Sequence, residues 1–348
     1  MPRKTVFVIG AGASSEVNLP TGHQLKEKIA QLLDIRFQHG ISQISGDRTI
    51  TNALRESTKY SSHQNDELNS YLHEAQHIGD ALQLALSIDN FIDQHRDNEK
   101  IALCGKLAIV KSILEAEGHS LLYFKQDRID STISFKSLEK TWYLNFFRLL
   151  TENCQKDELK ERLDSITLII FNYDRCVEFF ILKALQKTYK IDEKEAADLV
   201  KCLSIYHPYG SVGLLPSLAT NNTIAFGQLP NANQLLALAQ QIKTFTEGTD
   251  PKSSDIQEIK EHMARATHLC FIGFAFHKLN MNLITPASEI KNAPIVRCFA
   301  TAYGVSDSNK EEISQKISSL YSNHEVSVKI KSLKCNEFFN EFWNNLTF

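Results

Sequence analysis

The chain has 348 residues, more than one small domain needs, so we expect one large domain with an insertion, or two domains. Its formal net charge of −3 and the lack of a basic run argue against direct nucleic-acid binding, because phosphate-backbone binders carry a basic patch. No run of 18 apolar residues occurs, and the apolar run at residues 6–9 is too short for a signal peptide, so we expect a soluble cytoplasmic protein without a membrane span.

Six short runs rich in β-branched or aromatic residues predict the strands of a parallel sheet. In chain order they are Thr5–Ile9, Ile166–Phe171, Leu203–Tyr206, His268–Ile272, Ile295–Ala300 and Val326–Ile330. The last run alternates apolar and polar residues, as an edge strand does. Helical patterns lie between the strands, at Gln24–Leu33, Arg175–Leu185, Asn233–Phe245 and Ile256–Ala264. This alternation predicts an α/β, Rossmann-like fold, with a mostly parallel six-stranded sheet and helices on both faces.

Residues 36–160 differ, because they show no convincing strand and several helical periodicities. One helix face carries Leu103, Leu107, Val110 and Leu114, and Ser87 is placed to cap another helix. Trp142, Phe146 and Leu150 are spaced for a third helix. The polar stretch at 40–69 reads as loop or frayed helix. We interpret residues 1–348 as a single domain with a large helical insertion at 36–160.

The first candidate site is a glycine-rich turn at residues 8–15, directly after the first strand. Glycines let a backbone approach a diphosphate, and free helix N–H groups attract its charge. The dehydrogenase fingerprint needs a third glycine where Ser15 stands, and an acidic residue ending a second strand near residues 33–38, where no strand is evident. A glycine turn without any ligand is the alternative interpretation.

Polar residues also follow later strands, and the carboxyl ends of parallel strands are where ligands bind. Asn172 and Asp174 follow the second strand, although Asp174 as a helix cap and Asn172 in a turn would explain them equally well. His207 follows the third strand and is a candidate general base, with a structural histidine as the alternative. Gly273 follows the fourth strand.

A metal site is not expected. The seven cysteines are scattered without any C-x-x-C pair, and the histidines show no ligand spacing. Single cysteines in apolar surroundings are typical of small core residues in a reducing compartment.

Taken in order, these motifs resemble the sirtuin-like NAD-binding domains, and more closely the bacterial anti-phage members that degrade NAD. The resemblance covers nearly the whole chain. It is carried by residues 10–14 and 19–22, by Phe171-Asn172-Tyr173-Asp174, by His207 with Gly210-Ser211, by Gly273-Phe274, and by residues 87–91 and 105–109.

The resemblance implies a role for each matching position. Asn172 and His207 would be catalytic, with His207 as the base. The nucleotide-binding positions would be Gly10, Ala11, Gly12, Ser14, Pro20, Thr21, Asp174, Gly210 and Gly273. Gly10, Gly12 and Ser14 would cradle the phosphates, Asp174 would lie near the carboxamide, and Gly273 would approach the adenosine half.

Two departures separate the chain from protein-deacylating sirtuins: the four zinc-binding cysteines are absent, and Thr21-Gly22-His23 replaces the usual Asp-Phe-Arg continuation. We therefore expect an NAD hydrolase, using NAD as substrate and no metal, that cleaves the nicotinamide–ribose bond to give nicotinamide and ADP-ribose, with a cyclic form of ADP-ribose as the alternative product. A sirtuin-type deacylase and a non-catalytic nucleotide-sensing subunit are the alternatives.

The resemblance also implies an NAD-depleting effector of abortive infection. Such an enzyme must be restrained, and no sensor module is evident in the sequence. We expect the trigger to be a separate sensor protein encoded nearby, with self-assembly into a homo-oligomer or a small nucleotide as alternatives.

Overall fold

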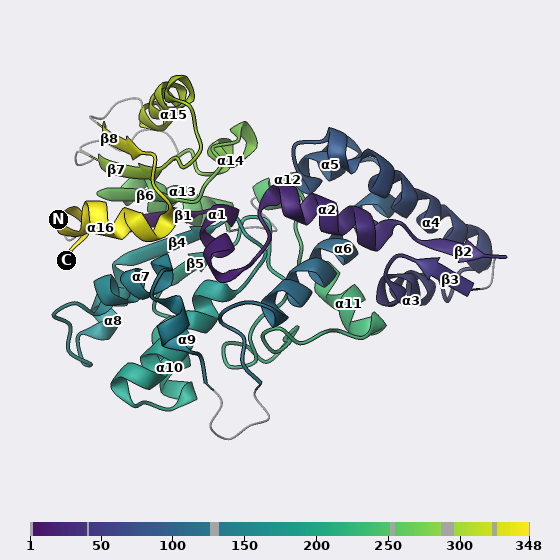
Figure 1. Cartoon of the computed structure of the whole chain (residues 1–348), viewed down its shortest axis with the longest axis horizontal. Coiled ribbons are helices and arrows are strands. Elements are labelled where there is room, and N and C mark those ends of the chain that lie inside the picture. The colour runs from purple at the N-terminus through teal and green to yellow at the C-terminus, as the bar shows by residue number, and fades with distance from the viewer. Residues whose placement is uncertain are drawn as a thin grey trace.

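The centre of the molecule is a six-stranded sheet in which all strands run parallel (Figure 1). The computed structural model describes residues 3–39, 42–125, 132–250, 255–286, 296–321 and 326–347. The strands are β1 (Thr5–Ile9), β4 (Ile166–Ile170), β5 (Ser204–Tyr206), β6 (His268–Ile272), β7 (Val296–Thr301) and β8 (Val326–Lys331). Their order across the sheet is β5-β4-β1-β6-β7-β8. The predicted fold class is confirmed, and the six predicted strands match within one residue at each described end; Ile295 lies outside the described residues.

The central strand β1 is buried on both faces, as expected for a parallel sheet covered by helices. Val6 and Val8 belong to one hydrophobic cluster, and Phe7 and Ile9 belong to the other. The alternation of side chains along a strand therefore sends neighbouring residues of β1 into two separate cores. The outer strand β8 is partly exposed in alternation, which confirms the predicted edge strand.

Helices cover each face of the sheet. The face of Val6 and Val8 packs against α13 (Ile256–Arg265) and α15 (Asp307–Ser319). The face of Phe7 and Ile9 packs against α7 (Trp142–Thr151), α9 (Cys176–Tyr189) and α16 (Cys335–Leu346). The shorter α8 (Leu159–Asp164) and α10 (Glu193–Val200) lie beside them. None of the helices in the described residues is long and apolar enough to cross a membrane.

A second group of helices extends to one side of the sheet (Figure 1). Its members are α2 (Gly22–Leu33), α3 (Arg48–Ser57), α4 (Gln64–Ala81), α5 (Ile88–Gln94), α6 (Glu99–Gly118) and α11 (Ala232–Ala239). The contacts of α2 and α11 with α6 place both inside this group, although neither falls within residues 36–160. Conversely, α7 falls within that range but packs on the sheet. The helical region is thus assembled from three separate stretches of chain.

Two details of residues 36–160 differ from the sequence expectation. The expectation of no strand there is wrong, because β2 (Arg36–Gln38) and β3 (Ser42–Ser45) form a small antiparallel pair. The polar stretch at 40–69 is also more ordered than expected. It contains α3, whose N-cap is Asp47 through a 2.8 Å bond from the Ile50 amide. Ile50, Ala53 and Leu54 form its buried stripe, a pattern that the surrounding polar residues obscured.

Candidate functional site

The strand order identifies one edge of the sheet as the candidate site. Numbered among themselves, the six strands lie in the order 3-2-1-4-5-6. Chain connections therefore lead in opposite directions from β1 and β6, which are neighbours. In sheets of this order, dinucleotides bind in the crevice outside the carboxyl ends of the strands at that reversal. The turns after β1 and β6 carry the predicted Gly10-Ala11-Gly12 and Gly273.

Those two turns pack backbone against backbone. A Cβ atom at Gly10 would lie 2.5 Å from the Gly273 carbonyl oxygen, and one at Gly12 would lie 3.0 Å from Gly273 Cα. Gly273 has φ +58°, and a Cβ there would lie 2.2 Å from the Ala13 nitrogen. Only glycine tolerates both that conformation and that proximity. The glycines are thus needed for the contact between the two turns.

Three backbone amides of the glycine turn already have acceptors. Gly10 donates to the Ile272 carbonyl and Gly12 to the Gly273 carbonyl, each at 3.0 Å, and Ala13 donates to the Gly10 carbonyl at 2.9 Å. The short helix α1 (Ala11–Ser14) follows directly. A diphosphate that bound any of these three amides would have to displace its present contact.

Asn172 joins the end of β4 to the glycine turn. Its Nδ2 donates to the Gly10 carbonyl at 3.1 Å and to Ser14 Oγ at 2.8 Å, and both side chains are buried. The structure therefore brings Asn172, Gly10 and Ser14 together. β4 is the second strand in this order, so the end of the second strand, where the sequence analysis looked for an acidic residue near 33–38, is at residues 171–174. The helices between β1 and β4 lengthen the connection, so β4 comes much later in the chain than the second strand of an ordinary dinucleotide-binding fold.

Asp174 is buried next to this cluster, one residue before Arg175, the N-cap residue of α9. Its Oδ1 accepts a bond of 3.1 Å from the Cys176 amide, the first amide of α9. Burial raises the pKa of the Asp174 carboxyl, and hydrogen bonds from Ser14 and Cys176 oppose that shift. Asp174 thus bonds the start of the helix without being its N-cap residue, and its carboxyl is within reach of Ser14.

His207 contacts an acceptor with each of its ring nitrogens. Nδ1 lies 2.9 Å from the backbone carbonyl of Asn172, and Nε2 lies 2.7 Å from Oε1 of Glu178 in the first turn of α9. A neutral imidazole has only one N–H, so His207 and Glu178 must share an additional proton. Burial alone would lower the pKa of His207, but the Glu178 carboxylate and the Asn172 carbonyl outweigh it, and the pKa is raised.

The other oxygen of Glu178 is buried without a partner in the described structure. The Glu178 residue is also one of those that line a pocket of about 200 Å³ between α9, β5 and the segment that follows β5. His207 and Ser211 also line this pocket, and most of the remaining wall is apolar. The pocket is separate from the glycine turn, which does not contribute to its lining.

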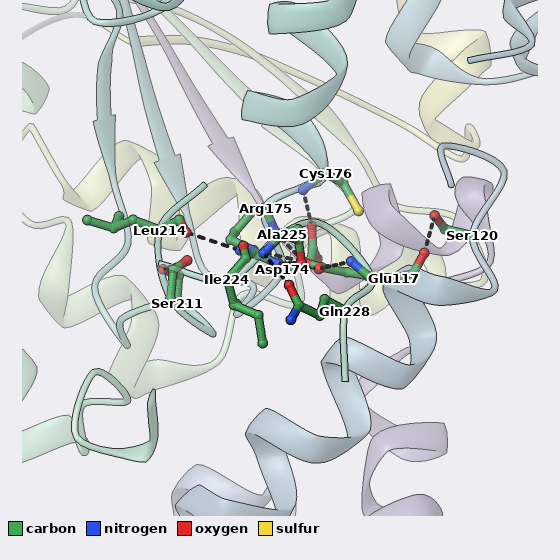
Figure 2. Close-up of polar contacts among 12 residues, drawn as sticks. Glu117, Ser120, Asp174, Arg175, Cys176, Ser211, Leu214, Ile224, Ala225 and Gln228 are labelled. Atoms are coloured by element: carbon green, nitrogen blue, oxygen red, sulfur yellow. Dashed lines mark hydrogen bonds and ion pairs between the residues drawn. The ribbon is translucent and has the colours of Figure 1, made fainter. Parts of the chain in front are cut away.

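A buried ion pair between Arg175 and Glu117 joins the end of α6 to the start of α9 (Figure 2). Arg175 is 2% exposed and Glu117 at the end of α6 is 0% exposed. Arg175 Nε donates to Glu117 Oε1 at 3.1 Å, a second bond joins Nη2 to Oε2, and Nη1 donates to the Ile224 carbonyl at 2.6 Å. The pair ties α6, α9 and the loop around residue 224 together.

A second polar connection links the helical region to the strand ends. The Tyr173 hydroxyl donates to Asp89 of α5. Burial raises the pKa of Asp89, and the Tyr173 bond opposes that shift. The Tyr209 hydroxyl donates to Asn280 of α14 (Lys278–Leu283) at 2.8 Å.

The remaining predicted residues lie apart from this cluster or have structural partners. Pro20 and Thr21 precede α2, where the Thr21 amide donates to the Gln24 side chain at 2.9 Å. Gly210 has φ +72°, and a Cβ there would lie 1.8 Å from the Gln241 carbonyl oxygen. What approaches Gly210 closely is thus the chain itself. Among the described residues, no group of three or more His, Cys, Asp or Glu side chains is arranged to hold a metal ion.

The sequence analysis did not single out Glu178, Glu117 or Arg175. Glu117 had a readable signal, because it continues the apolar stripe of α6 three residues after Leu114 and would be buried by that spacing. A buried carboxylate requires a cationic partner, and Arg175 supplies it. Glu178 lies four residues after Asp174, but only the packing of β5 against β4 shows that it meets His207.

No protein-family model matches the chain, and a search of curated proteins finds no match either.

Proposed function

We propose that the chain is an NAD hydrolase that binds the dinucleotide across the carboxyl ends of β4, β1 and β6. The observation that carries the proposal is the strand order, because its reversal between β1 and β6 is where dinucleotides bind in sheets of this type. The polar residues at the end of β4, with Asn172 bonded to the glycine turn, support the same location. The resemblance to NAD-degrading sirtuin-like domains supplies the reaction.

In the proposed reaction, water attacks the ribose carbon as the bond to nicotinamide breaks. Nicotinamide leaves with the bonding electron pair and becomes neutral, so no strong acid is needed. The water oxygen forms the new bond, and its proton is released. The protein must position the ribose and accept or relay that proton. Asn172 is assigned the first role and His207 the second.

His207 imposes a condition on this assignment. Both of its nitrogens face acceptors, so it has no free lone pair in the arrangement described. Catalytic hydrogen bonds often rearrange when substrate binds. As a base, His207 must release Glu178 or the Asn172 carbonyl when NAD enters.

A nucleotide-binding subunit without hydrolysis is the second candidate. The occupied nitrogens of His207 favour it, because a sensing protein needs no free base. The two candidates differ in one measurement, since both bind NAD and only the hydrolase releases nicotinamide.

The test is nicotinamide release from NAD by the whole chain and by Asn172→Ala. We expect the variant to lose about 10²-fold or more in rate, the range for a positioned catalytic group. Asn309→Ala, at an exposed position, is the control and should retain full activity. Melting temperatures must be recorded for each protein, because Asn172 also bonds Ser14. Wild-type activity in a folded Asn172→Ala protein would contradict the proposal, and NAD binding without turnover in the wild type would favour the second candidate.

His207→Ala alone is a poor probe, because it leaves the buried Glu178 carboxylate without its donor. The double variant His207→Ala/Glu178→Gln should instead be compared with the single variant Glu178→Gln. A further loss of about 10²-fold would support His207 as the base. If the rate fell no further, the proton released by the attacking water would have to go to another acceptor.

The proposed effector role requires a restrained enzyme. Turnover per protein should therefore be low for the dilute purified chain, and should rise with protein concentration or with a separate activating partner. Rapid turnover independent of concentration would contradict restraint but not hydrolysis.

A further inference from the structure

In the turn between β4 and α9, successive side chains bond alternately to two different parts of the molecule. Asn172 bonds Ser14 of the glycine turn at 2.8 Å, and Asp174 interacts with the same hydroxyl. Tyr173 and Arg175 instead bond acidic side chains of the helical region. The candidate site and the helical region are therefore joined through one short stretch of chain.

The bond from Arg175 to α6 is deeply buried (Figure 2). Its partner Glu117 is 0% exposed and contacts Arg175 through both carboxylate oxygens. Glu117 also accepts a bond of 3.1 Å from the Gly227 amide. Separating this pair would leave two buried charges without partners, which is strongly unfavourable. This connection is therefore a fixed part of the fold.

The bond from Tyr173 to α5 is anchored much less firmly. Its acceptor is Asp89 in the first turn of the helix, and this residue is only partly buried. No other side chain in the described part of the chain bonds Asp89. When the bond breaks, water can solvate the carboxyl, so the cost is that of a single hydrogen bond. Of the two connections, this is the one that can open while the protein stays folded.

We propose that Asp89 is a positioning residue: by holding the Tyr173 hydroxyl, it keeps the turn after β4 in the form that directs Asn172 to the glycine turn. The Tyr173 carbonyl already accepts a 3.0 Å bond from the Val212 amide, and the Asp89 bond fixes the far end of the side chain. A residue held at two points cannot rotate. Held at its carbonyl alone, Tyr173 can turn and take the adjoining Asn172 with it.

The effect of Asp89 on the reaction rate rests on the proposed NAD hydrolysis, in which Asn172 positions the ribose. Its effect on the Asn172 amide does not, because that effect concerns the protein alone. The inference also names α5 as the element through which a partner bound to the helical region would act on the site. A partner that moves α5 away from Tyr173 lowers the rate, and one that stabilises the bond raises it.

The experiment follows the Asn172 side-chain amide by NMR in the whole chain, together with kcat and KM for NAD. Tyr173→Phe removes the hydroxyl, and Asp89→Ala removes its acceptor. In each variant we expect hydrogen exchange of the Asn172 amide to rise about tenfold. We expect kcat to fall about tenfold with little change in KM, because the ribose is bound but misplaced.

Two further variants separate positioning from a general loss of stability. Asp89→Asn keeps an acceptor for Tyr173 and should restore both the protection of the Asn172 amide and kcat. The double variant Tyr173→Phe/Asp89→Ala should lose no more than either single variant, because all three lack the same bond. Additive losses in the double variant would overturn the inference.

Two matched controls should leave the Asn172 amide and kcat unchanged. Tyr321→Phe removes another buried tyrosine hydroxyl, which donates to the Met263 carbonyl at 2.8 Å, and Asp93→Ala changes the next turn of α5. An Asn172 amide that stays protected in folded Tyr173→Phe and Asp89→Ala proteins would overturn the inference, as would an unchanged kcat. A wild type that releases no nicotinamide would contradict the proposed hydrolysis alone, because the exchange measurement needs no NAD.

Discussion

The carboxyl edge of the sheet has two halves, which are held together by different kinds of contact. At β1 and β6, backbone packs on backbone, and Gly10, Gly12 and Gly273 leave no room for a side chain. At β4 and β5, buried side chains carry the contacts, through the Asn172 amide and the His207–Glu178 pair. The first half is held by close backbone contacts and backbone hydrogen bonds. The second half holds a proton shared by His207 and Glu178, so pH can alter it.

The largest expected effect is on the backbone half. Gly273→Ala places a Cβ at φ +58° within 2.2 Å of the Ala13 nitrogen. Strain and overpacking together should lower the free energy of unfolding by about 4 kcal/mol or more. The matched control is Gly304→Ala, with φ +73° and no atom within 4 Å, which should cost only about 1 kcal/mol of backbone strain. Urea unfolding measures both, and similar losses would show that proximity to the glycine turn is unimportant.

Next comes the side-chain half, tested at its buried ion pair. Glu117→Gln leaves the Arg175 guanidinium buried without a carboxylate and should cost about 3 kcal/mol in urea unfolding. Asp198→Asn breaks the exposed pair with Lys201 and should cost less than about 1 kcal/mol. If Glu117→Gln were as mild as the control, the pair would not hold α6 and α9 together.

A smaller effect is expected from Asp89, whose pKa is raised by burial despite the Tyr173 bond. The folded protein then binds this proton more tightly than the unfolded chain, so its contribution to stability is present at low pH. That contribution is lost as the pH rises above the ordinary value of 3.8 and through the folded pKa. Asp89→Asn keeps an acceptor for Tyr173 and removes the titration.

The measurement for Asp89 is the difference in unfolding free energy between Asp89→Asn and wild type as a function of pH. It should increase in favour of the variant as the pH rises from 4, and then level off. Asp97→Asn, at an exposed position after α5, should show no such trend. A difference that falls with increasing pH would reverse the inferred direction of the shift.

The last prediction is that removal of metal ions has no effect on stability. With no metal-holding group among the described residues, a chelator should leave the melting temperature unchanged. A stoichiometric metal signal that disappears together with stability would contradict this.

The sequence was informative where local pattern decides structure. Runs such as Thr5–Ile9 are apolar throughout because both faces of the strand are buried, and this can be read without a fold. Ser87 was correctly identified as a cap, with its side chain accepting a 3.1 Å bond from Asn90. The residues that follow each strand could be placed on one edge because parallel strands end together.

Contacts between residues that are far apart in the sequence could not be predicted from local patterns. The approach of Gly210 to Gln241 depends on how the loop after β5 meets the end of α11. Likewise, the pairing of His207 with Glu178 needs β5 beside β4 and α9 above them. The same limit applies to the place of β4 in the sheet. The strand itself was predicted at 166–171, but not that it lies beside β1 as the second strand of the dinucleotide-binding order.

The position of β1 between β4 and β6 also determines when the sheet can form during translation. Thr5 is hydrogen-bonded in register between Ile166 and His268, so the first strand made has no neighbour until those segments leave the ribosome. At ordinary elongation rates that delay is on the order of tens of seconds. Throughout it, the glycine turn lacks Gly273 and the edge proposed to bind NAD does not exist. A nascent chain therefore lacks the proposed NAD-binding edge until β6 has been made.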